Sequence, residues 1–234
     1  MRKKVNQKQE LKNTKPVKHT SSPMSSSFHW EFKNQSQKLA WSLYQQHQIL
    51  FLTGPAGSAK TFISTAFAIT EVINKTKKKI VLTRPIVEAG EKLGFLPGDL
   101  NEKVDPYMMP LYDSINKLVK GSQREYIEQS LNVVPIAFMR GLTFTDSVCI
   151  FDEAQNATYK QLVLFLTRLG ENSKMIITGD TEQTDLKELS VALTDIIEDV
   201  QTIRGIGVMQ FQDSDIVRSP LVSEILKKTR KRMV

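Results

Sequence analysis

The sequence predicts an α/β domain in which a mainly parallel central sheet lies between two layers of helices. Three observations support this fold class: short apolar runs recur along the chain, each run is continuous rather than alternating, and helical segments stand between them. Continuous apolar runs are typical of strands that are buried on both faces, as in a parallel sheet with helices on each side. Strand–helix alternation of this kind gives a doubly wound domain.

The elements follow from these patterns in chain order. Strands are expected at 49–52, 80–82, 148–151 and 175–177, with a further strand at 208–211. Helices are expected at about 34–46, where Leu39, Ala40, Leu43 and Tyr44 share one side, at 60–74, and at about 220–230. Residues 84–140 contain five prolines and two helical stretches, near 107–120 and 122–131. We interpret them as an insertion between strands, where substrate contacts are often built.

Length and composition indicate one domain outside the membrane. The chain has 234 residues, of which 40% are hydrophobic, and this is enough for one core of ordinary size. Its single cysteine, Cys149, lies in an apolar run and excludes an intrachain disulfide. No apolar stretch is long enough for a membrane span, and the first residues lack the apolar segment of a secretory signal. We therefore expect a cytoplasmic protein with no membrane partner.

The positive charge is concentrated at the two ends of the chain. Six of the seven net positive charges lie in residues 1–27, and a second basic cluster occupies 227–234. Because residues 1–27 have no apolar periodicity, we expect a disordered tail followed by one folded domain at 28–234. Two interpretations of the basic ends stay open, attraction of nucleic acid and a solvated tail that only aids solubility.

A glycine-rich loop follows the first predicted strand and leads into a predicted helix. Its residues are Gly54, Pro55, Ala56, Gly57, Ser58, Ala59, Lys60 and Thr61. This is the context of a Walker A loop, in which backbone N–H groups and a helix N-terminus surround a nucleotide phosphate. Lys60 would reach the β- and γ-phosphate oxygens, and the Thr61 hydroxyl can bind Mg²⁺. The alternative, an ordinary strand-to-helix turn, is disfavoured by the Lys-Thr pair.

One position departs from the usual pattern of such loops. Ala59 stands where glycine commonly precedes the lysine. Because alanine disfavours positive φ, we expect Ala59 to have a negative φ, with its methyl group directed away from the phosphate.

An acidic pair follows the strand predicted at 148–151. Asp152 would hold the Mg²⁺ shell, and Glu153 would accept a proton from the water that attacks the γ-phosphate. The alternative is an acidic pair at a helix N-terminus, which is common. Together with the glycine-rich loop, the pair predicts ATP hydrolysis.

Two further candidates lie later in the chain. Gln183 follows the strand predicted at 175–177 and can hydrogen-bond both the γ-phosphate and the attacking water. Arg218 precedes the last predicted helix, where its guanidinium would stabilise γ-phosphate charge as an arginine finger or remain an ordinary surface side chain. Arg168 and Arg140 are lesser candidates for the same role.

Several longer segments resemble the PhoH-like ATPases, a family related to the RecA-like cores of superfamily 1 helicases. The most specific segment is TRPIVEAGEKLGFLPGDL at 83–100. The others are DPY at 105–107, PLYD at 110–113, FMRG at 138–141, DEAQN at 152–156, LTRLG at 166–170 and VRSPLV at 217–222. The resemblance covers about 34–226 and implies a RecA-like, three-layer P-loop NTPase. It is greatest to the short bacterial or phage-encoded members.

The resemblance also implies an activity and partners. It implies a Mg²⁺-dependent, helicase-like ATPase coupled to single-stranded RNA or DNA, with Arg84 and Pro85 near the nucleic-acid backbone. It further implies an adenine-reading glutamine before the first strand, for which Gln37 fits best and Gln35 is the alternative. Because one RecA-like domain has no second domain to move against, we expect a ring-like homo-oligomer, such as a hexamer, in which Arg218 reaches the neighbouring ATP.

Two other function classes remain open from the sequence. A nucleotide-dependent binding or switch module with slow hydrolysis and no unwinding is mildly favoured by Ala59. A small-molecule kinase shares the glycine-rich loop, but Glu153 and Gln183 indicate water as the phosphate acceptor.

Overall fold

The computed structural model describes residues 28–85, 100–181 and 191–217, together with Leu221, Glu224 and Lys228. The tail expected at 1–27 lies outside the described residues. So do nearly all of the basic end at 227–234 and most of the helix expected at 220–230. In the described part, no helix is both long enough and apolar enough to cross a membrane.

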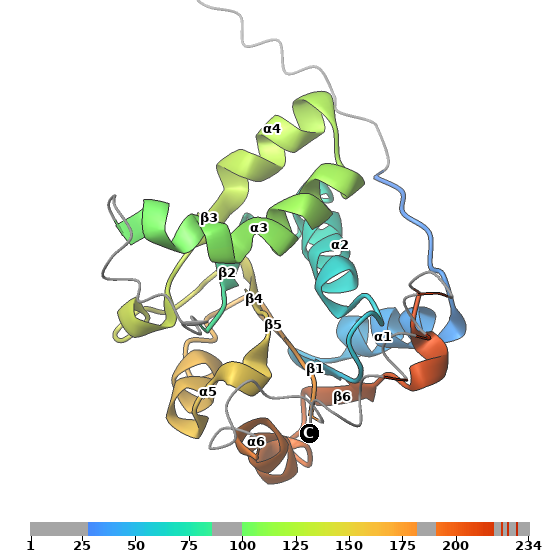
Figure 1. The fold of residues 1–234 in the computed structure, drawn as a ribbon. Coiled ribbons are helices and arrows are strands. Elements are labelled where there is room, and N and C mark those ends of the chain that lie inside the picture. The colour runs from blue at the N-terminus through green and yellow to red at the C-terminus, as the bar shows by residue number, and fades with distance from the viewer. Residues whose placement is uncertain are drawn as a thin grey trace, which may run out of the picture.

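Six parallel strands form one sheet in the order β3-β2-β4-β5-β1-β6 (Figure 1). They are β1 (Ile49–Thr53), β2 (Lys79–Thr83), β3 (Leu131–Val133), β4 (Ser147–Phe151), β5 (Lys174–Gly179) and β6 (Ile206–Gln210). The parallel α/β sheet predicted from the continuous apolar runs is therefore confirmed. All five residues of β1 and of β4 are buried, as strands covered on both faces require.

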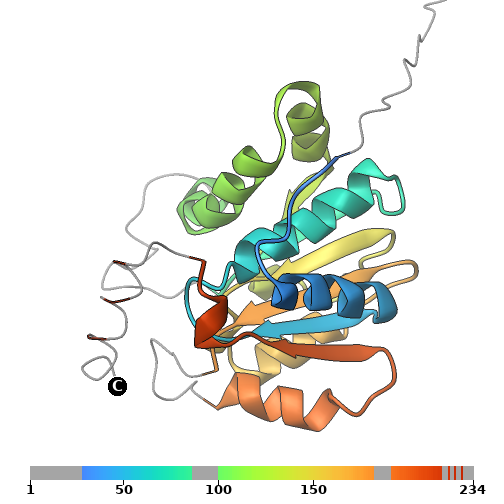
Figure 2. The ribbon, with the colours of Figure 1, turned by 90° about the vertical axis from the view of Figure 1, so that its right-hand side faces the viewer.

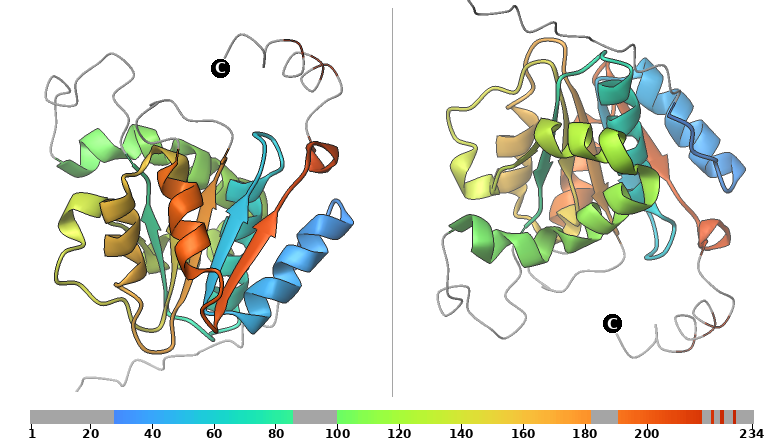
Figure 3. Two further views of the ribbon diagram at one scale, coloured as in Figure 1. Left: turned by 90° about the horizontal axis from the view of Figure 1, so that it is seen from below. Right: turned by 90° about the horizontal axis from the view of Figure 1, so that it is seen from above.

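Helices cover both faces of this sheet. They are α1 (Gln35–Gln46), α2 (Lys60–Ile73), α3 (Leu100–Leu118), α4 (Gly121–Ser130), α5 (Tyr159–Leu166) and α6 (Ala192–Val200). Figure 2 shows α3 and α4 lying over α2 on one side of the sheet, and α6 on the other. The two views of Figure 3 show these opposite faces, with α5 and α6 over one and α2, α3 and α4 over the other.

Two hydrophobic clusters occupy the two faces. The first joins α1, α2, α3 and α4 to the sheet around Phe67, which contacts the rings of Trp30, Trp41 and Tyr44. The second joins α5 and α6 to the other face, with the ring of Phe165 packed against the ring of Phe151 in β4. The sheet is thus buried between two helical layers, as a three-layer αβα domain requires.

Among the strands and α-helices of the described residues, β3, α5 and α6 were not predicted from the sequence. Strand β3 is short and lies at the sheet edge with its residues only partly protected, so it lacks a continuous apolar run. The helix expected near 122–131 ends at Ser130, and Leu131 begins β3. Helices α5 and α6 complete the second layer, and α5 begins at a capping box formed by Thr158 and Gln161.

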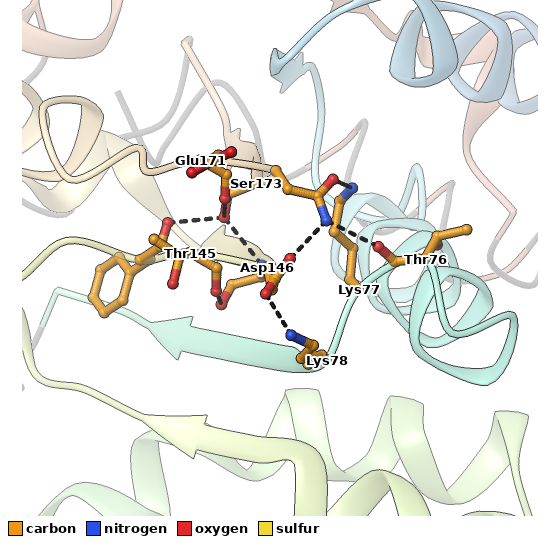
Figure 4. Close-up of polar contacts among 10 residues, drawn as sticks. Thr76, Lys77, Lys78, Thr145, Asp146, Glu171 and Ser173 are labelled. Carbon is orange, nitrogen blue, oxygen red and sulfur yellow. Dashed lines mark hydrogen bonds and ion pairs between the residues drawn. The ribbon is translucent and has the colours of Figure 1, made fainter.

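A polar cluster ties together the amino ends of β2, β4 and β5 (Figure 4). Asp146 accepts hydrogen bonds from Lys78 Nζ at 2.7 Å and from Asn172 Nδ2 at 2.7 Å, while Lys77 Nζ donates to Asn172 Oδ1 at 2.8 Å. Ser173 Oγ donates to the carbonyl of Phe144 at 2.8 Å. These bonds join three separate turns, and they lie at the edge of the sheet opposite the glycine-rich loop.

At the carboxyl edge, the strand order determines which loops meet. Strand β5 lies between β1 and β4, so its last residues stand between the glycine-rich loop and the acidic pair. The register places Thr53 of β1 beside Gly179 of β5. This is the edge of an open parallel sheet at which ligands bind.

Candidate nucleotide-binding site

The glycine-rich loop is held close to the chain that follows β6. Gly54 has a φ of 132°, and a Cβ atom at this position would lie 2.5 Å from the carbonyl oxygen of Phe211. Gly57 has a φ of 94°. Across the turn, Ser58 donates from Oγ to the carbonyl of Pro55 at 2.9 Å. The first glycine is therefore required both by backbone conformation and by the close approach of the chain after β6.

The conformation expected for Ala59 was wrong. Ala59 has a φ of 67° and a ψ of 26°, which is the left-handed region, and it is the N-cap of α2. The turn into the helix needs this conformation whichever residue occupies it, so alanine accepts strain that glycine would avoid. An alanine side chain offers no hydrogen bond to the first N–H groups of α2. A helix N-terminus without a side-chain cap suits a bound anion.

The Lys60 ammonium group lies over its own loop. Its Nζ donates to the carbonyl of Gly54 at 2.6 Å and to that of Pro55 at 3.0 Å. The positive charge of Lys60 therefore lies beside the first two residues of the glycine-rich loop.

Asp152 links the loop to the neighbouring strands. Its side chain is buried, and its Oδ1 accepts hydrogen bonds from Thr61 Oγ1 at 2.8 Å and from Thr178 Oγ1. Its Oδ2 accepts no hydrogen bond from any described residue. Burial raises the pKa of Asp152, and the negative charge of Glu153 raises it further, although the hydrogen bonds and Arg84 oppose this. Such a carboxylate is stabilised by a positive charge nearby.

Arg84 supplies part of that charge. Its guanidinium nitrogens lie 3.9 Å from Asp152 Oδ2 and 3.7 Å from Glu153 Oε1, and 23% of its side chain is exposed. The resemblance implied that Arg84 and Pro85 lie near a nucleic-acid backbone. In this structure the guanidinium lies beside the acidic pair.

Glu153 has an unusual backbone conformation for its residue type. Its φ of 54° and ψ of 44° are left-handed, and its side chain is 36% exposed. Its Oε2 accepts a hydrogen bond from Gln155 Nε2 at 2.5 Å. Strained backbone of this kind costs about 1–3 kcal/mol and is concentrated at functional sites. Glu153 thus has both the access to solvent and the fixed position that a proton acceptor needs.

A cavity of ≈ 290 Å³ adjoins the start of the glycine-rich loop. It lies between that loop, the end of β5 and the turn that follows β6. Its lining comprises Gly54, Pro55, Asp180, Thr181, Gln210, Phe211, Gln212, Asp213 and Ser214. The polar lining suits a hydrophilic ligand group next to the phosphate loop.

The remaining sequence-predicted candidates are placed differently. Gln37 is buried near the start of α1, where its Oε1 accepts the backbone N–H of Lys33 at 2.8 Å, while Gln35 is exposed. Gln183 and Arg218 lie outside the described residues. The residue before Arg218, Val217, donates its backbone N–H to the carbonyl of Gly57 at 3.1 Å, so the chain passes the phosphate loop at that point.

The two lesser arginine candidates also differ from each other. Arg168 donates to the carbonyls of Leu164 at 3.2 Å and Leu142 at 3.0 Å, so its guanidinium ties a loop to the end of α5. Arg140 is exposed.

Sequence reasoning gave no role to Thr178 or to Gln155. Thr178 is the penultimate residue of β5 and donates to Asp152, a contact that only the strand order reveals. Gln155 lies two residues after Glu153 in the DEAQN segment. Its position in this segment was the available signal, but its burial is known only from the structure.

The hydroxyl and carboxylate oxygens in this site fit a magnesium ion. Thr61 Oγ1 and Asp152 Oδ1 are close together, and Asp152 Oδ2 has remaining acceptor capacity. Mg²⁺ prefers such oxygens and commonly takes its other ligands from water and phosphate. Within 28–85, 100–181 and 191–217, no group of three or more His, Cys, Asp or Glu forms a metal site made of protein ligands alone.

A six-stranded parallel sheet, a glycine-rich loop opening α2 and an acidic pair two strands away together define a P-loop NTPase fold of the RecA-like class. The large terminase of a thermophilic bacteriophage has a similar fold, with a TM-score of 0.50 and 10% sequence identity. That similarity covers 84% of this chain and 49% of the terminase chain. The sequence matches the family described as PhoH-like protein over residues 30–229. The chain belongs to the PhoH family.

Curated relatives agree with this membership. A PhoH-like protein of Bacillus subtilis is 44% identical over 198 residues, covering 83% of this chain and 62% of the relative. A PhoH-like protein of Synechocystis is 46% identical over 190 residues, covering 78% of this chain and 57% of the relative. Protein PhoH of Escherichia coli K12 is 40% identical over 199 residues, covering 83% of this chain and 56% of the relative. The match thus spans about three fifths of the length of these relatives.

Proposed function

We propose that this protein is a Mg²⁺-dependent ATPase. The observation that carries the proposal is the hydrogen bond from Thr61 to Asp152, because it joins the phosphate loop on β1 to the acidic end of β4. Loop, hydroxyl and carboxylate then converge on one point at the carboxyl edge of the sheet. Family membership supports the same conclusion.

In this proposal the phosphate loop binds the β- and γ-phosphates. The backbone N–H groups of the loop and the uncapped start of α2 donate to phosphate oxygens. Lys60 exchanges the carbonyls of Gly54 and Pro55 for phosphate oxygens, which are stronger acceptors because they carry charge. Thr61 and Asp152 hold Mg²⁺, which screens the phosphate charge.

Hydrolysis requires a group that accepts a proton from the attacking water. Glu153 fits this role because it is partly exposed, lies next to Asp152 and is held by Gln155. Gln183 would orient the same water, and Arg218 would stabilise the developing charge on the γ-phosphate. Gln37 would read the adenine edge through the amide nitrogen of its side chain.

A Glu153→Gln variant separates binding from hydrolysis. It keeps the size of the side chain and one acceptor oxygen for Gln155, but it removes the basic carboxylate. We expect its turnover to fall by about 10²–10⁴-fold, while its affinity for a non-hydrolysable ATP analogue stays near that of the wild type. Turnover near the wild-type value would show that another group accepts the proton.

The proposed partner is single-stranded RNA or DNA. The basic ends of the chain are the groups that would contact its phosphates, and such contacts weaken as salt rises. The measurement is the ATPase rate with and without poly-U at low and moderate salt. Stimulation that declines with salt supports a nucleic-acid-coupled ATPase, and a slow rate that poly-U does not change supports the alternative, a nucleotide-dependent switch module. The observation that favours that alternative is Ala59, which stands before Lys60 in a left-handed conformation.

We further propose that the domain works as a ring-like homo-oligomer, such as a hexamer. A single RecA-like domain needs a neighbour to convert nucleotide binding into relative movement. The mass in solution with an ATP analogue and single-stranded RNA tests this, and a monomer at micromolar concentration would contradict it.

A further inference from the structure

Gln155 forms a bridge between two parts of the candidate site. Its Nε2 donates to Glu153 Oε2 at 2.5 Å, and its Oε1 accepts the backbone N–H of Asp180 at 3.1 Å. The amide nitrogen of Gln155 therefore donates to the acidic pair, and its amide oxygen accepts from the residue that follows β5. A carboxamide is suited to such a bridge because its donor and its acceptor are separate atoms of one planar group.

The space around this amide is defined by the neighbouring strand. Gly179 is the last residue of β5, and a Cβ atom there would lie 3.1 Å from Gln155 Oε1 and 2.5 Å from Leu193 Cδ2. A larger residue would displace the amide or the leucine, so the glycine keeps room for the bridge. Gln155 is itself buried, and a buried amide without partners would be costly.

The two ends of the bridge belong to different functional regions. Glu153 is the proposed proton acceptor and has a strained, left-handed backbone. Asp180 lines the cavity beside Gly54 and Pro55. A single side chain thus connects the wall of the cavity to the carboxylate that would face the water.

We propose that Gln155 is a positioning residue, which fixes the Glu153 carboxylate for proton transfer and makes its orientation depend on the end of β5. This proposal rests on the ATPase function proposed above. A ligand that moves Asp180 would move the amide, and the amide would move the carboxylate. Because proton transfer is sensitive to displacements of about 1 Å, a small shift is sufficient to change the rate.

Two substitutions separate the two arms of the bridge. Gln155→Leu removes both hydrogen bonds. Gln155→Glu keeps an acceptor for the Asp180 N–H but replaces the donor that faces Glu153 with a carboxylate oxygen. Gln201→Leu is the matched control, because Gln201 is an exposed glutamine at the end of α6.

The kinetic prediction is a fall in kcat with little change in binding. Both Gln155 variants should lose at least about tenfold in kcat, with the dissociation constant of an ATP analogue within about twofold of the wild type. In a Glu153→Gln background, Gln155→Leu should have no further effect on single-turnover rate, because its target is already removed. If the two substitutions instead reduce the single-turnover rate independently, so that their effects multiply in the double variant, the proposal is overturned.

Amide hydrogen exchange tests the bridge without turnover. The Asp180 N–H should exchange faster in Gln155→Leu than in the wild type, and at nearly the wild-type rate in Gln155→Glu. Thermal unfolding of both variants shows whether each is folded. If Lys60→Ala abolishes turnover while folded Gln155→Leu and Gln155→Glu keep the wild-type kcat, the positioning role is wrong and the ATPase proposal stands. If Lys60→Ala keeps full turnover, the ATPase proposal itself is wrong.

Discussion

Ala59 adopts a left-handed conformation directly before Lys60, with a φ of 67°. The sequence identified a glycine-rich loop between a strand and a helix, because the residue types of such a loop follow one another locally. It did not predict this backbone angle, which is set by the turn that connects β1 to α2. Lys60, Thr61 and Asp152 were named from the sequence for the same local reason, whereas the contact between Thr61 and Asp152 depends on strands that are distant in the chain.

An Ala59→Gly substitution should stabilise the protein. Glycine adopts positive φ without strain, while alanine there costs about 1–2 kcal/mol, partly offset by the greater freedom of glycine in the unfolded chain. We expect the free energy of unfolding to rise by about 0.5–1 kcal/mol, measured by denaturant titration. Ala59→Val is the control and should lower it, since β-branched residues tolerate this region least. A lower free energy of unfolding for Ala59→Gly than for the wild type would contradict the claim that Ala59 is strained.

At the scale of the elements, the C-terminal carbonyl groups of helix α1 are capped by a residue of strand β5. The last turn of α1 contains no basic residue. Instead, Lys174 of β5 donates to the carbonyls of Tyr44, Gln45 and His47, the last two at 3.2 and 3.1 Å, and lies 4.4 Å from the centroid of the Tyr44 ring. The sequence predicted α1 from its apolar side, but this cap joins residues about 130 positions apart and has no local signature.

A Lys174→Met substitution should destabilise the protein through loss of this cap. A cation at a helix C-terminus and over an aromatic ring contributes about 1–2 kcal/mol in partly buried positions. We therefore expect the free energy of unfolding to fall by about 1–2 kcal/mol in a denaturant titration. The control is Lys79→Met, since Lys79 is the exposed first residue of β2. Equal effects of the two substitutions would contradict a specific cap.

For the elements as a group, the strands with continuous apolar runs were predicted and the short edge strand was not. Strand β3 has three residues, and its pairing with β2 rather than its composition makes it a strand. Helix α5 has eight residues and follows the acidic pair closely, so its start is determined by the capping box at Thr158. Short elements of this kind depend on tertiary contacts, which local patterns do not contain.

In the molecule as a whole, buried or partly buried carboxylates connect the strands at both the carboxyl and the amino ends of the sheet. At the carboxyl edge, Asp152 joins β4 to β5 and α2, and at the amino edge, Asp146 joins the turns before β2, β4 and β5. The buried thiol between these edges, Cys149, has a pKa raised by burial to about 12. The parallel sheet was predicted from the sequence, but the order β4-β5-β1 was not, because a short apolar run does not specify which strand it pairs with.

Asp146 gives a prediction for the pH dependence of stability. Hydrogen bonds from Lys78 and then from Asn172 hold its pKa below the ordinary value. A lowered folded-state pKa contributes stability that is present above the unfolded value and is lost as the pH falls through the folded value. Asp146→Asn should therefore lower the Tm near pH 7, and the difference from the wild type should shrink below about pH 4.

Asparagine is a suitable replacement at this position, because Asp146 has a φ of 51° and asparagine tolerates left-handed backbone. Asp113→Asn is the control, since its ion pair with Lys117 is well exposed and such pairs contribute little. A constant difference in Tm at all pH values would indicate a loss of packing rather than of charge.

The most direct test of the central claim is the rate of ATP hydrolysis by Lys60→Ala compared with the wild type, after thermal unfolding has shown that the variant is folded. If the glycine-rich loop binds the phosphates, removal of its ammonium group should reduce turnover by at least about 100-fold, because charge stabilisation at the γ-phosphate is lost. A folded Lys60→Ala protein that hydrolyses ATP at the wild-type rate would contradict the assignment of the whole site.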